Sequence, residues 1–381
     1  MAGDFRFGIE EEYFVNDAAK RDAARGRLKE FFAACGEHFS DEDVQREMLE
    51  PQVEVASQPT ADFAEARRKL AGLRSALGAL AREHDLAIMA AGTHPLAAWT
   101  RQRATSQARY GKLMHDLQML GSRNMVCGLH VHVEVPDLLA RVDLMNRVLP
   151  FLPLLLALST SSPFWQAQRT GLLGYRLAAY RELPRTGLPE LFEGAADYDR
   201  YIETLVAARA IEDSSYVWWV IRPSRKHPTL ELRVADSCTR LADTLALAAL
   251  YRCLVRRLAR DQNLNAELTG ASRAIIGENC WRAQRYGIHG SFVDEASRSA
   301  KPVADVLEHA LALVSDDAAA LGCVGEVEAT RDILARGTSA DRQLALHTEA
   351  LGRGLPNREA LASVVDWLSA ETVRQDAATV H

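Results

Sequence analysis

The sequence predicts an α+β fold in which one sheet is combined with long helices. Candidate strands and helices lack the regular β-α-β spacing of a doubly wound sheet, and no G-x-G-x-x-G turn follows a candidate strand. The strands instead alternate apolar and polar side chains, which is typical of a sheet with one covered face and one open face. No linker-like segment divides the chain, so we expect a single domain over 1–381 with a mainly helical C-terminal part from about 300.

The first half of the chain supplies most of the strands. Alternating or continuous apolar runs predict strands over 7–17, 52–57, 87–95 and 129–135. Apolar residues at helical spacing predict helices over 27–39, 60–85 and 110–123. The long helix over 60–85 has Thr60 or Asp62 in position to cap its N-terminus.

The second half is richer in helices. Residues 142–162 predict a buried helix that is kinked at its prolines, and 170–190 is rich in loop-forming residues. Further strands are expected over 216–224 and 229–236, and further helices over 198–211, 239–261 and 357–375. From about Asp305 onward the chain is mainly helical.

Composition excludes several classes of function. The 381 residues are 48% hydrophobic and 25% charged, with a formal charge of -6 and no Lys/Arg cluster, so no nucleic-acid partner is expected. The six cysteines are scattered without a C-x-x-C pair, which indicates packed, reduced thiols rather than a zinc ribbon or disulfide framework. The start of the chain has no apolar leader, and the apolar run 148–159 is short and interrupted by proline, so we expect no membrane span and a cytoplasmic location.

The strand over 7–17 contains three consecutive glutamates. Side chains alternate across a strand, so Glu10 and Glu12 share one face, while Glu11 lies with the apolar residues on the other. Glutamate is depleted in strands, and like charges on one face repel. We expect Glu11 near an edge or a bulge of the sheet.

The same two-faced pattern recurs on three other strands. Opposite their aliphatic faces lie Glu54 in "QVEVAS", His130, His132 and Glu134 in "GLHVHVEV", and Glu231 and Arg233 in "TLELRVAD". If the strands form one sheet, these glutamates would repel unless cations held them. Mg²⁺ or Mn²⁺ prefers such oxygen ligands and commonly binds together with phosphates, so the face is a candidate metal-nucleotide site.

A simpler interpretation stays open for each strand. A single E-x-E is more often a solvated sheet face than a metal site, and H-x-H alone is weaker evidence still. The recurrence of the pattern on four strands makes a site about as well supported as a solvated face.

Five motifs resemble one known family. They are "GIEEEYFV", "AAGTHPLAAW", "GLHVHVEVPD", "WWVIRPSRKHPTLELRVADS" and "ENCWRAQRYGI". Together they are similar to the bacterial carboxylate-amine ligases described as glutamate-cysteine ligase type 2, the YbdK-like group. The resemblance extends from near the N-terminus to about Gly290, and five motifs in the same order make it specific.

The resemblance implies a fold similar to glutamate-cysteine ligase and glutamine synthetase. In that fold a curved, mainly antiparallel sheet carries the active site on its concave face, and helices pack on its convex face. The resemblance also implies ATP and Mg²⁺, with Mn²⁺ as an alternative, small carboxylate and amine substrates, and a homodimer. By motif, the metal ligands are Glu10, Glu12, Glu54, His130 and Glu231. Arg233 would contact the transferred phosphate, and Arg233 and Glu54 are the expected catalytic residues.

The implied reaction joins a carboxylate to an amine at the expense of ATP. ATP would phosphorylate the carboxylate, and the amine would attack the acyl phosphate, so that no nucleophilic side chain is needed. Glutamate and cysteine are the nearest family substrates, and activity on that pair can be weak. A metal-dependent hydrolase built on His130-x-His132 and a non-catalytic nucleotide-binding protein are the alternatives.

Further residues are weaker candidates. Arg222, Arg282 and Arg285 are expected to bind ATP phosphates or a substrate carboxylate, with a structural salt bridge as the equal alternative. Arg109, Tyr110, Arg176 and His94 are expected to be structural more often than functional, and Trp218 and Trp219 to pack in the core or sheet. Val220 departs from the acidic residue that the family often has there. If that acidic residue helps to bind the amine, the amine preference of this chain is in doubt, and if it is structural, nothing follows.

Overall fold

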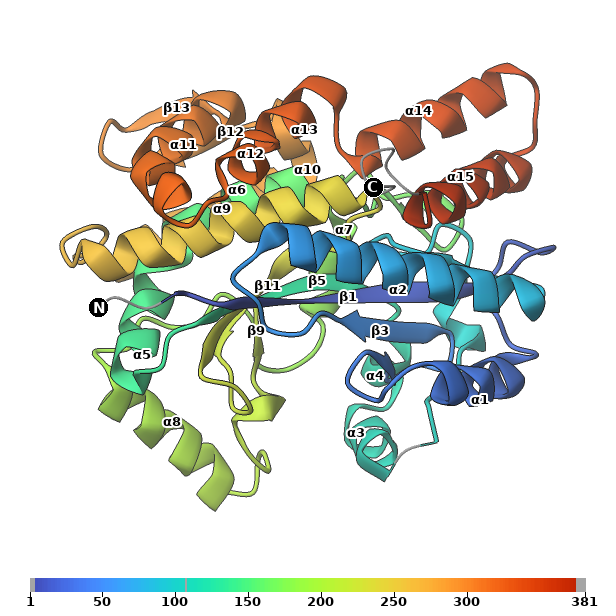
Figure 1. The fold of residues 1–381 in the computed structure, drawn as a ribbon, viewed down its shortest axis with the longest axis horizontal. Helices are drawn as coiled ribbons and strands as arrows, with labels where there is room; N and C mark the ends of the chain where they lie inside the picture. Colours follow the sequence, from blue (N-terminus) through green and yellow to red (C-terminus); the bar gives the residue numbers. More distant parts are fainter. Residues whose placement is uncertain (1–3, 107, 375–381) are drawn as a thin grey trace.

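The computed structural model describes residues 4–106 and 108–374 (Figure 1). Its centre is an antiparallel seven-stranded sheet in the order β10-β11-β5-β1-β3-β2, with β4 paired to the far end of β1. The strands are β1 Phe7–Asp17, β2 Val44–Arg46, β3 Gln52–Ala56, β4 Leu86–Met89, β5 Gly128–Glu134, β10 Ile221–Pro223 and β11 Thr229–Asp236. The α+β class and the mainly antiparallel sheet are therefore confirmed.

Helices cover one face of the sheet in two layers (Figure 1). The layer that contacts the sheet contains α2 Phe63–Glu83, α6 Leu152–Ser159 and α9 Leu241–Arg260. Beyond it lie α10 Gly270–Tyr286, α11 Val303–Ala320, α12 Val324–Glu328, α13 Thr330–Arg336 and α14 Ser339–Gly352, whereas α15 Asn357–Thr372 packs on both α14 and β4. Asp62, one of the two residues predicted to cap α2, is the N-cap and accepts a hydrogen bond from the Ala64 amide.

Shorter elements surround the other face and the edges. They include α1 Leu28–His38, α3 Ala108–Leu117, α4 Met119–Arg123, α5 Leu138–Val148, α7 Tyr175–Tyr180 and α8 Ala195–Ala207. The 3₁₀ turns are Trp99–Arg101, Leu149–Phe151, Ser214–Tyr216 and Gly287–His289. Three separate strand pairs join β6 Phe164–Trp165 to β7 Gln168–Arg169, β8 Thr186–Gly187 to β9 Trp218–Trp219, and β12 Ser291–Asp294 to β13 Ser299–Pro302.

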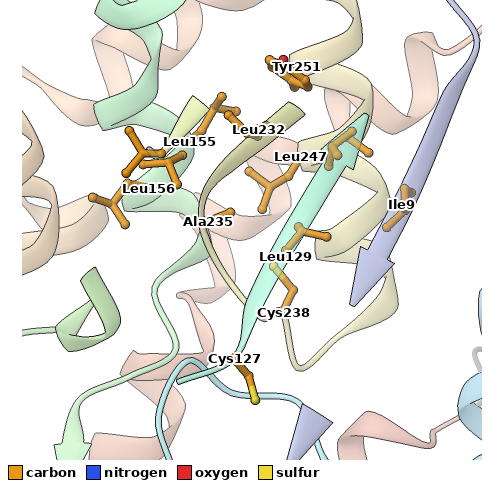
Figure 2. Close-up of a cluster of buried hydrophobic side chains, with 14 of the residues drawn as sticks. Ile9, Cys127, Leu129, Leu155, Leu156, Leu232, Ala235, Cys238, Leu247 and Tyr251 are labelled. Carbon is orange, nitrogen blue, oxygen red and sulfur yellow. The ribbon is translucent and has the colours of Figure 1, made fainter. Parts of the chain in front are cut away.

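The core lies between the sheet and the first helical layer. Figure 2 shows Leu129 and Leu232 of the sheet beside Leu155 of α6 and Leu247 of α9. All four side chains are fully buried, and each contributes about 1.5–3 kcal/mol through the apolar surface removed from water. Leu129 and Leu232 belong to the aliphatic strand faces that the alternation pattern predicted.

Several elements differ from the predictions. The strand expected over 216–224 is interrupted at Val220, because β9 pairs with β8 whereas β10 pairs with β11. The helix expected over 110–123 is broken at Gln118, whose φ of 50° is incompatible with an α-helix. The helix α10 and the hairpin β12–β13 were not predicted.

The prolines of 142–162 act as expected. They separate α5 from α6 by a 3₁₀ turn. Within the described residues, Leu138–Ser159 is the one helical stretch whose length and mean hydropathy of 1.4 would fit a membrane span. However, 78% of its most apolar window is buried inside the fold, and a core helix passes the same test.

Glu11 is not near an edge or a bulge, so that expectation is wrong. It lies in the middle of the sheet, because β1 pairs there with both β3 and β5. The Glu11 carboxylate is fully buried in a salt bridge with Arg74 of α2, and it also accepts hydrogen bonds from Tyr13 and Thr244. Burial raises its pKa, but the Arg74 charge and these hydrogen bonds outweigh burial and leave the pKa below its usual value.

Candidate functional site

The sheet register brings the predicted polar residues together on the face away from α2 and α9. The cross-strand pairs are Glu10–His130, Glu12–Glu54 and Glu231–His132. A cavity of about 760 Å³ lies over this face, and all six of these residues line it together with Arg222 and Arg233. A solvated sheet face would be flat and wet, whereas these side chains form the floor of a cavity.

One group of carboxylates in the cavity contains a residue that the sequence analysis missed. Glu12, Glu47 and Glu54 each offer an oxygen within 4.8 Å of the other two. Burial and the neighbouring Glu12 raise the pKa of Glu47 to about 7, and burial with Glu10 and Glu47 raises the pKa of Glu54 well above its usual value. A cation between these carboxyls would offset their mutual repulsion and favour their ionised forms.

Two further groups share Glu10. Glu10 lies with Glu54 and His130 in one group and with His132 and Glu231 in the other. Its oxygens are 3.3 Å from His130 Nδ1 and 3.4 Å from His132 Nε2. Burial raises the Glu10 pKa, but the two imidazoles outweigh burial and hold it well below its usual value.

The donor set suits a hard divalent cation. Among the described residues, Nε2 of His130 is buried without a hydrogen-bond partner, whereas Nε2 of His132 has Glu10 Oε1 at 3.4 Å. The nearest carboxylate oxygen recorded for His130 Nε2 is Glu12 Oε1, at 3.8 Å. The clustered carboxylate oxygens match the ligands that Mg²⁺ or Mn²⁺ prefers, and the unpartnered imidazole nitrogen of His130 is a further candidate ligand beside them.

Glu231 is held by two arginines. Arg222 donates from Nε to Glu231 Oε2 at 2.8 Å and from Nη2 to Oε1 at 3.1 Å, and Arg233 donates from Nη1 to Oε1 at 2.5 Å. Burial raises the Glu231 pKa, but both guanidinium groups outweigh burial and lower it. A metal-ligand role for Glu231 therefore stays a prediction.

The two arginines differ in the donors they leave available. Arg222 also donates to the carbonyls of Ser215 and Val217, so its guanidinium is almost fully used inside the protein. Arg233 lines the cavity, and its Nη2 is 3.4 Å from the Tyr180 hydroxyl. Arg233 is thus better placed than Arg222 to contact a substrate, and Arg222 is placed to orient Glu231.

Arg176 is closely tied to the site although the sequence favoured a structural role. It is almost completely buried, it lines the cavity, and its Nη1 donates to the carbonyls of Arg233 and Ala235. The register of β11 shifts between Leu232 and Ala235, so these carbonyls lie within and at the end of the irregular stretch. Gly128 leaves the space for this guanidinium, because a Cβ there would be 2.2 Å from Arg176 Nη2.

The structure places Arg282 and Arg285 away from the cavity. Both lie on α10, which packs against α6 in the helical layers. Arg282 donates to the carbonyl and hydroxyl of Ser291, and Arg285 lies over the Tyr286 ring. Their position gives no support to the expected contact with ATP, because neither side chain lines the cavity.

The remaining candidates separate into cavity-lining and structural residues. Tyr110 and Trp218 line the cavity, Trp219 stacks on Tyr201 in the core, and Val220 is buried. His94 accepts hydrogen bonds from the amides of Leu96 and Ala97 and contacts Asn16, which assigns it to the turn after β4. The side chain of Arg109 lies outside the described residues.

The family model described as "Glutamate-cysteine ligase family 2(GCS2)" matches residues 6–366. The chain belongs to glutamate-cysteine ligase family 2. The resemblance stated from the five motifs is thereby confirmed, and the family makes the chain a carbon-nitrogen ligase. Cavity-lining Glu10, Glu12, Glu54, His130, Glu231 and Arg233 all lie within the matched residues.

Curated members of the family are similar over almost their whole length. A protein of Rhodospirillum rubrum named "Putative glutamate--cysteine ligase 2" is 46% identical over 97% of this chain and 96% of its own. A protein of Bradyrhizobium diazoefficiens with the same name is 44% identical over 98% of this chain and 85% of its own.

Solved structures of lower identity share the fold. A glutamate-cysteine ligase of Francisella tularensis, crystallised with AMP, matches with a TM-score of 0.68 at 13% identity, over 98% of this chain and 90% of its own. A bifunctional glutathione synthetase of Pasteurella multocida matches with a TM-score of 0.69 at 13% identity, over 96% of this chain and 52% of its own.

Proposed function

We propose that this family member is an ATP- and Mg²⁺-dependent carboxylate-amine ligase that works through an acyl phosphate. The observation that carries the proposal is the row of carboxylates and imidazoles on one sheet face, with Arg233 beside it in a 760 Å³ cavity. Glutamate and cysteine are the proposed first substrates, with weak activity on that pair. The glutamate-cysteine ligase of Francisella tularensis, which has the same fold, was crystallised in complex with AMP, and this supports the use of an adenine nucleotide.

The carboxylate groups would hold the divalent cations. Glu12, Glu47 and Glu54 form one candidate ligand set, and Glu10 with His130 adds a second beside it. When bound, Mg²⁺ would neutralise the ATP phosphates and ATP would supply the phosphoryl group to the substrate carboxylate. Manganese fits the same oxygen-rich set.

Arg233 would stabilise the phosphoryl group during transfer. Its guanidinium is fixed on Glu231 through Nη1, which leaves other N–H groups of the planar fork to meet phosphate oxygens. Arg222 and Arg176 would act by positioning, since Arg222 orients Glu231 and Arg176 holds the backbone of β11 at Arg233 and Ala235, where the register shifts. The cavity walls would restrict water, which favours attack by the amine over hydrolysis of the acyl phosphate.

The same geometry argues against the hydrolase alternative. A hydrolase built on His130 and His132 needs both imidazoles on one ion, yet the two rings lie in different ligand groups joined through Glu10. The pairing of Glu231 with Arg233 suits transfer of a phosphoryl group better than activation of water.

ADP release tests the proposal directly. Purified protein would be incubated with Mg²⁺, ATP, glutamate and a panel of amines that includes cysteine. Glu54→Gln and Arg233→Ala are expected to reduce ADP release at least about tenfold, because each removes a charge that transfer requires. Glu83→Gln, on the exposed end of α2, is the matched control.

The outcomes separate the site from the activity. Undiminished turnover in both site variants would contradict the site assignment. Absence of ADP with every substrate pair would contradict the ligase activity, and tightly held Zn²⁺ in the purified protein would favour the hydrolase. The predicted cytoplasmic location and homodimer are checked separately by fractionation and by sedimentation.

A further inference from the structure

A second cavity lies in the helical part of the protein, on the opposite side of the sheet from the candidate active site. It has a volume of about 450 Å³, where α13, α14 and α15 meet one end of α9 (Figure 1). Its lining residues are Arg240, Leu241, Ala242, Arg336, Arg342, Trp367, Glu371 and Arg374. The start of α9 and the three consecutive helices α13, α14 and α15 therefore contribute to it.

The lining carries a surplus of positive charge. Four of the side chains that line it are arginines and one is a carboxylate, Glu371. Arg240 and Arg374 both bond to Glu371, at 3.1 Å and 3.3 Å. Each oxygen of the one lining carboxylate is thus already shared with a guanidinium, and among the described lining residues the arginines outnumber the carboxylates.

Two of the arginines form ion pairs with carboxylates that do not line the cavity. Arg336 pairs with Asp243, and Arg342 pairs with Glu349 at 3.3 Å. Each of these pairs uses one nitrogen of a guanidinium that has five N–H donors. The side chains of Arg342 and Arg374 are 44% and 70% exposed, so their unused donors are accessible to a ligand from solvent.

The end of α9 adds donors to the same place. Arg240 is its N-cap residue and has no side-chain capping bond, and Leu241 and Ala242 are the first residues of this 20-residue helix. The first amides of a helix have no partner within it and carry the positive end of the dipole. Nη1 of Arg240 is also covered from solvent with no hydrogen-bond acceptor among the described residues, and Asp243 Oδ2 is 3.8 Å away.

We propose that this cavity binds a small multivalent oxyanion of the phosphate or diphosphate class. Guanidinium forks converging with helix amides match phosphate oxygens in both charge and hydrogen-bond geometry. The site is distinct from the proposed ligase site, because none of its lining residues lines the larger cavity. Free diphosphate and the phosphate groups of a larger metabolite share this chemistry.

A purely structural network of ion pairs is the competing explanation. In such a network the arginines would serve only to pack α9 against α13–α15, and no dissolved anion would bind to them. The surplus of guanidinium groups over carboxylates in the lining and the uncapped α9 argue for a ligand instead.

Calorimetric titration of the full chain tests the proposal. Inorganic phosphate and diphosphate would be titrated separately into Mg²⁺-free protein without ATP, so that neither turnover nor the proposed metal site takes part. We expect saturable binding with one site per chain, tighter for diphosphate, and weaker in high salt because the arginines are partly exposed. A phosphorylated sugar as a third ligand shows whether the site accepts an esterified phosphate.

Variants locate the binding. Arg342→Gln combined with Arg374→Gln is expected to raise the dissociation constant for diphosphate roughly tenfold, because two charge-assisted contacts are lost. Arg353→Gln, at the exposed end of α14, is the matched control and should bind normally. Arg233→Ala should also bind normally, because Arg233 lines the other cavity.

Three results would overturn the proposal. They are the absence of saturable binding of both anions in the millimolar range, unchanged binding in the Arg342/Arg374 double variant, and loss of binding in Arg233→Ala alone. Circular dichroism of each variant would show that it is folded. Because no outcome depends on ADP release, failure here leaves the proposed ligase activity untouched.

Discussion

Replacement of Glu11 by glutamine is expected to destabilise the protein strongly without touching the cavity. Glu11 accepts bonds from Arg74 Nε at 2.9 Å, Thr244 Oγ1 at 2.6 Å and the Tyr13 hydroxyl at 2.5 Å. Glutamine keeps the shape but removes the charge, which leaves the buried Arg74 guanidinium without a counter-ion. Breaking a buried ion pair in this way costs about 3–5 kcal/mol.

We expect the cost of Glu11→Gln to lie at the lower end of this range of about 3–5 kcal/mol. Arg74 also donates to the carbonyls of Thr239 and Cys238, at 2.8 Å and 2.9 Å, and these dipoles compensate part of the charge. We therefore expect the free energy of unfolding to fall by about 3 kcal/mol in Glu11→Gln. The double variant Glu11→Gln with Arg74→Met should lose less than the sum of the single variants, because no unpaired charge remains.

Urea unfolding followed by circular dichroism measures both quantities. The pH dependence adds a second test, because the Glu11 pKa is below its unfolded value near 4.5. The stabilisation is present above that pH and is lost as pH falls through the folded pKa, so Glu11→Gln should be less sensitive to acid in this window. A loss under about 1 kcal/mol with additive variants would refute the reasoning.

Three further predictions concern the candidate site. Gly128→Ala should lower ADP release at least about tenfold, because its Cβ would meet Arg176 Nη2 at 2.2 Å and His130 Nε2 at 3.1 Å. Gly111→Ala is the control, because the space around a Cβ at Gly111 is open. Glu47→Gln should raise the Mg²⁺ concentration for half-maximal ADP release roughly tenfold, since one oxygen ligand loses its charge, and an unchanged Mg²⁺ titration would remove Glu47 from the site. Arg233→Lys should keep the charge but lose the fork, so steady-state kinetics should show kcat reduced by about 10–100-fold; full activity would contradict bidentate phosphate contact.

The polar face could be predicted because alternation is a property of the backbone. Five polar residues alternate with the aliphatic residues of their strands and therefore lie on the opposite face: Glu10, Glu12, Glu54, His130 and Glu231. The register of the sheet then places them side by side. Alternation assigns each residue to a face of its own strand, whereas the pairing of the strands into one sheet brings these faces together.

Other features depend on contacts that local sequence does not encode. Glu47 follows the short strand β2, so alternation gave no signal for it, although it lies beside Glu12 and Glu54. Alternation showed that Glu11 lies on the aliphatic face of its strand, but its partner Arg74 comes close only because α2 packs on the sheet. Arg282 and Arg285 belong to a family motif, yet the helix that carries them packs away from the cavity.

The position of α9 has a consequence for the order in which the protein can become active during synthesis. All strands of the main sheet have been made once residue 236 is complete, but α9 is buried along almost its whole length between the sheet and later helices. The amide of Ala90, directly after β4, also bonds to Thr372 Oγ1 in α15. A nascent chain released after α9 would therefore expose an apolar helix to chaperones and proteases. We expect the folded, active state to form only when the segment through α15 has left the ribosome.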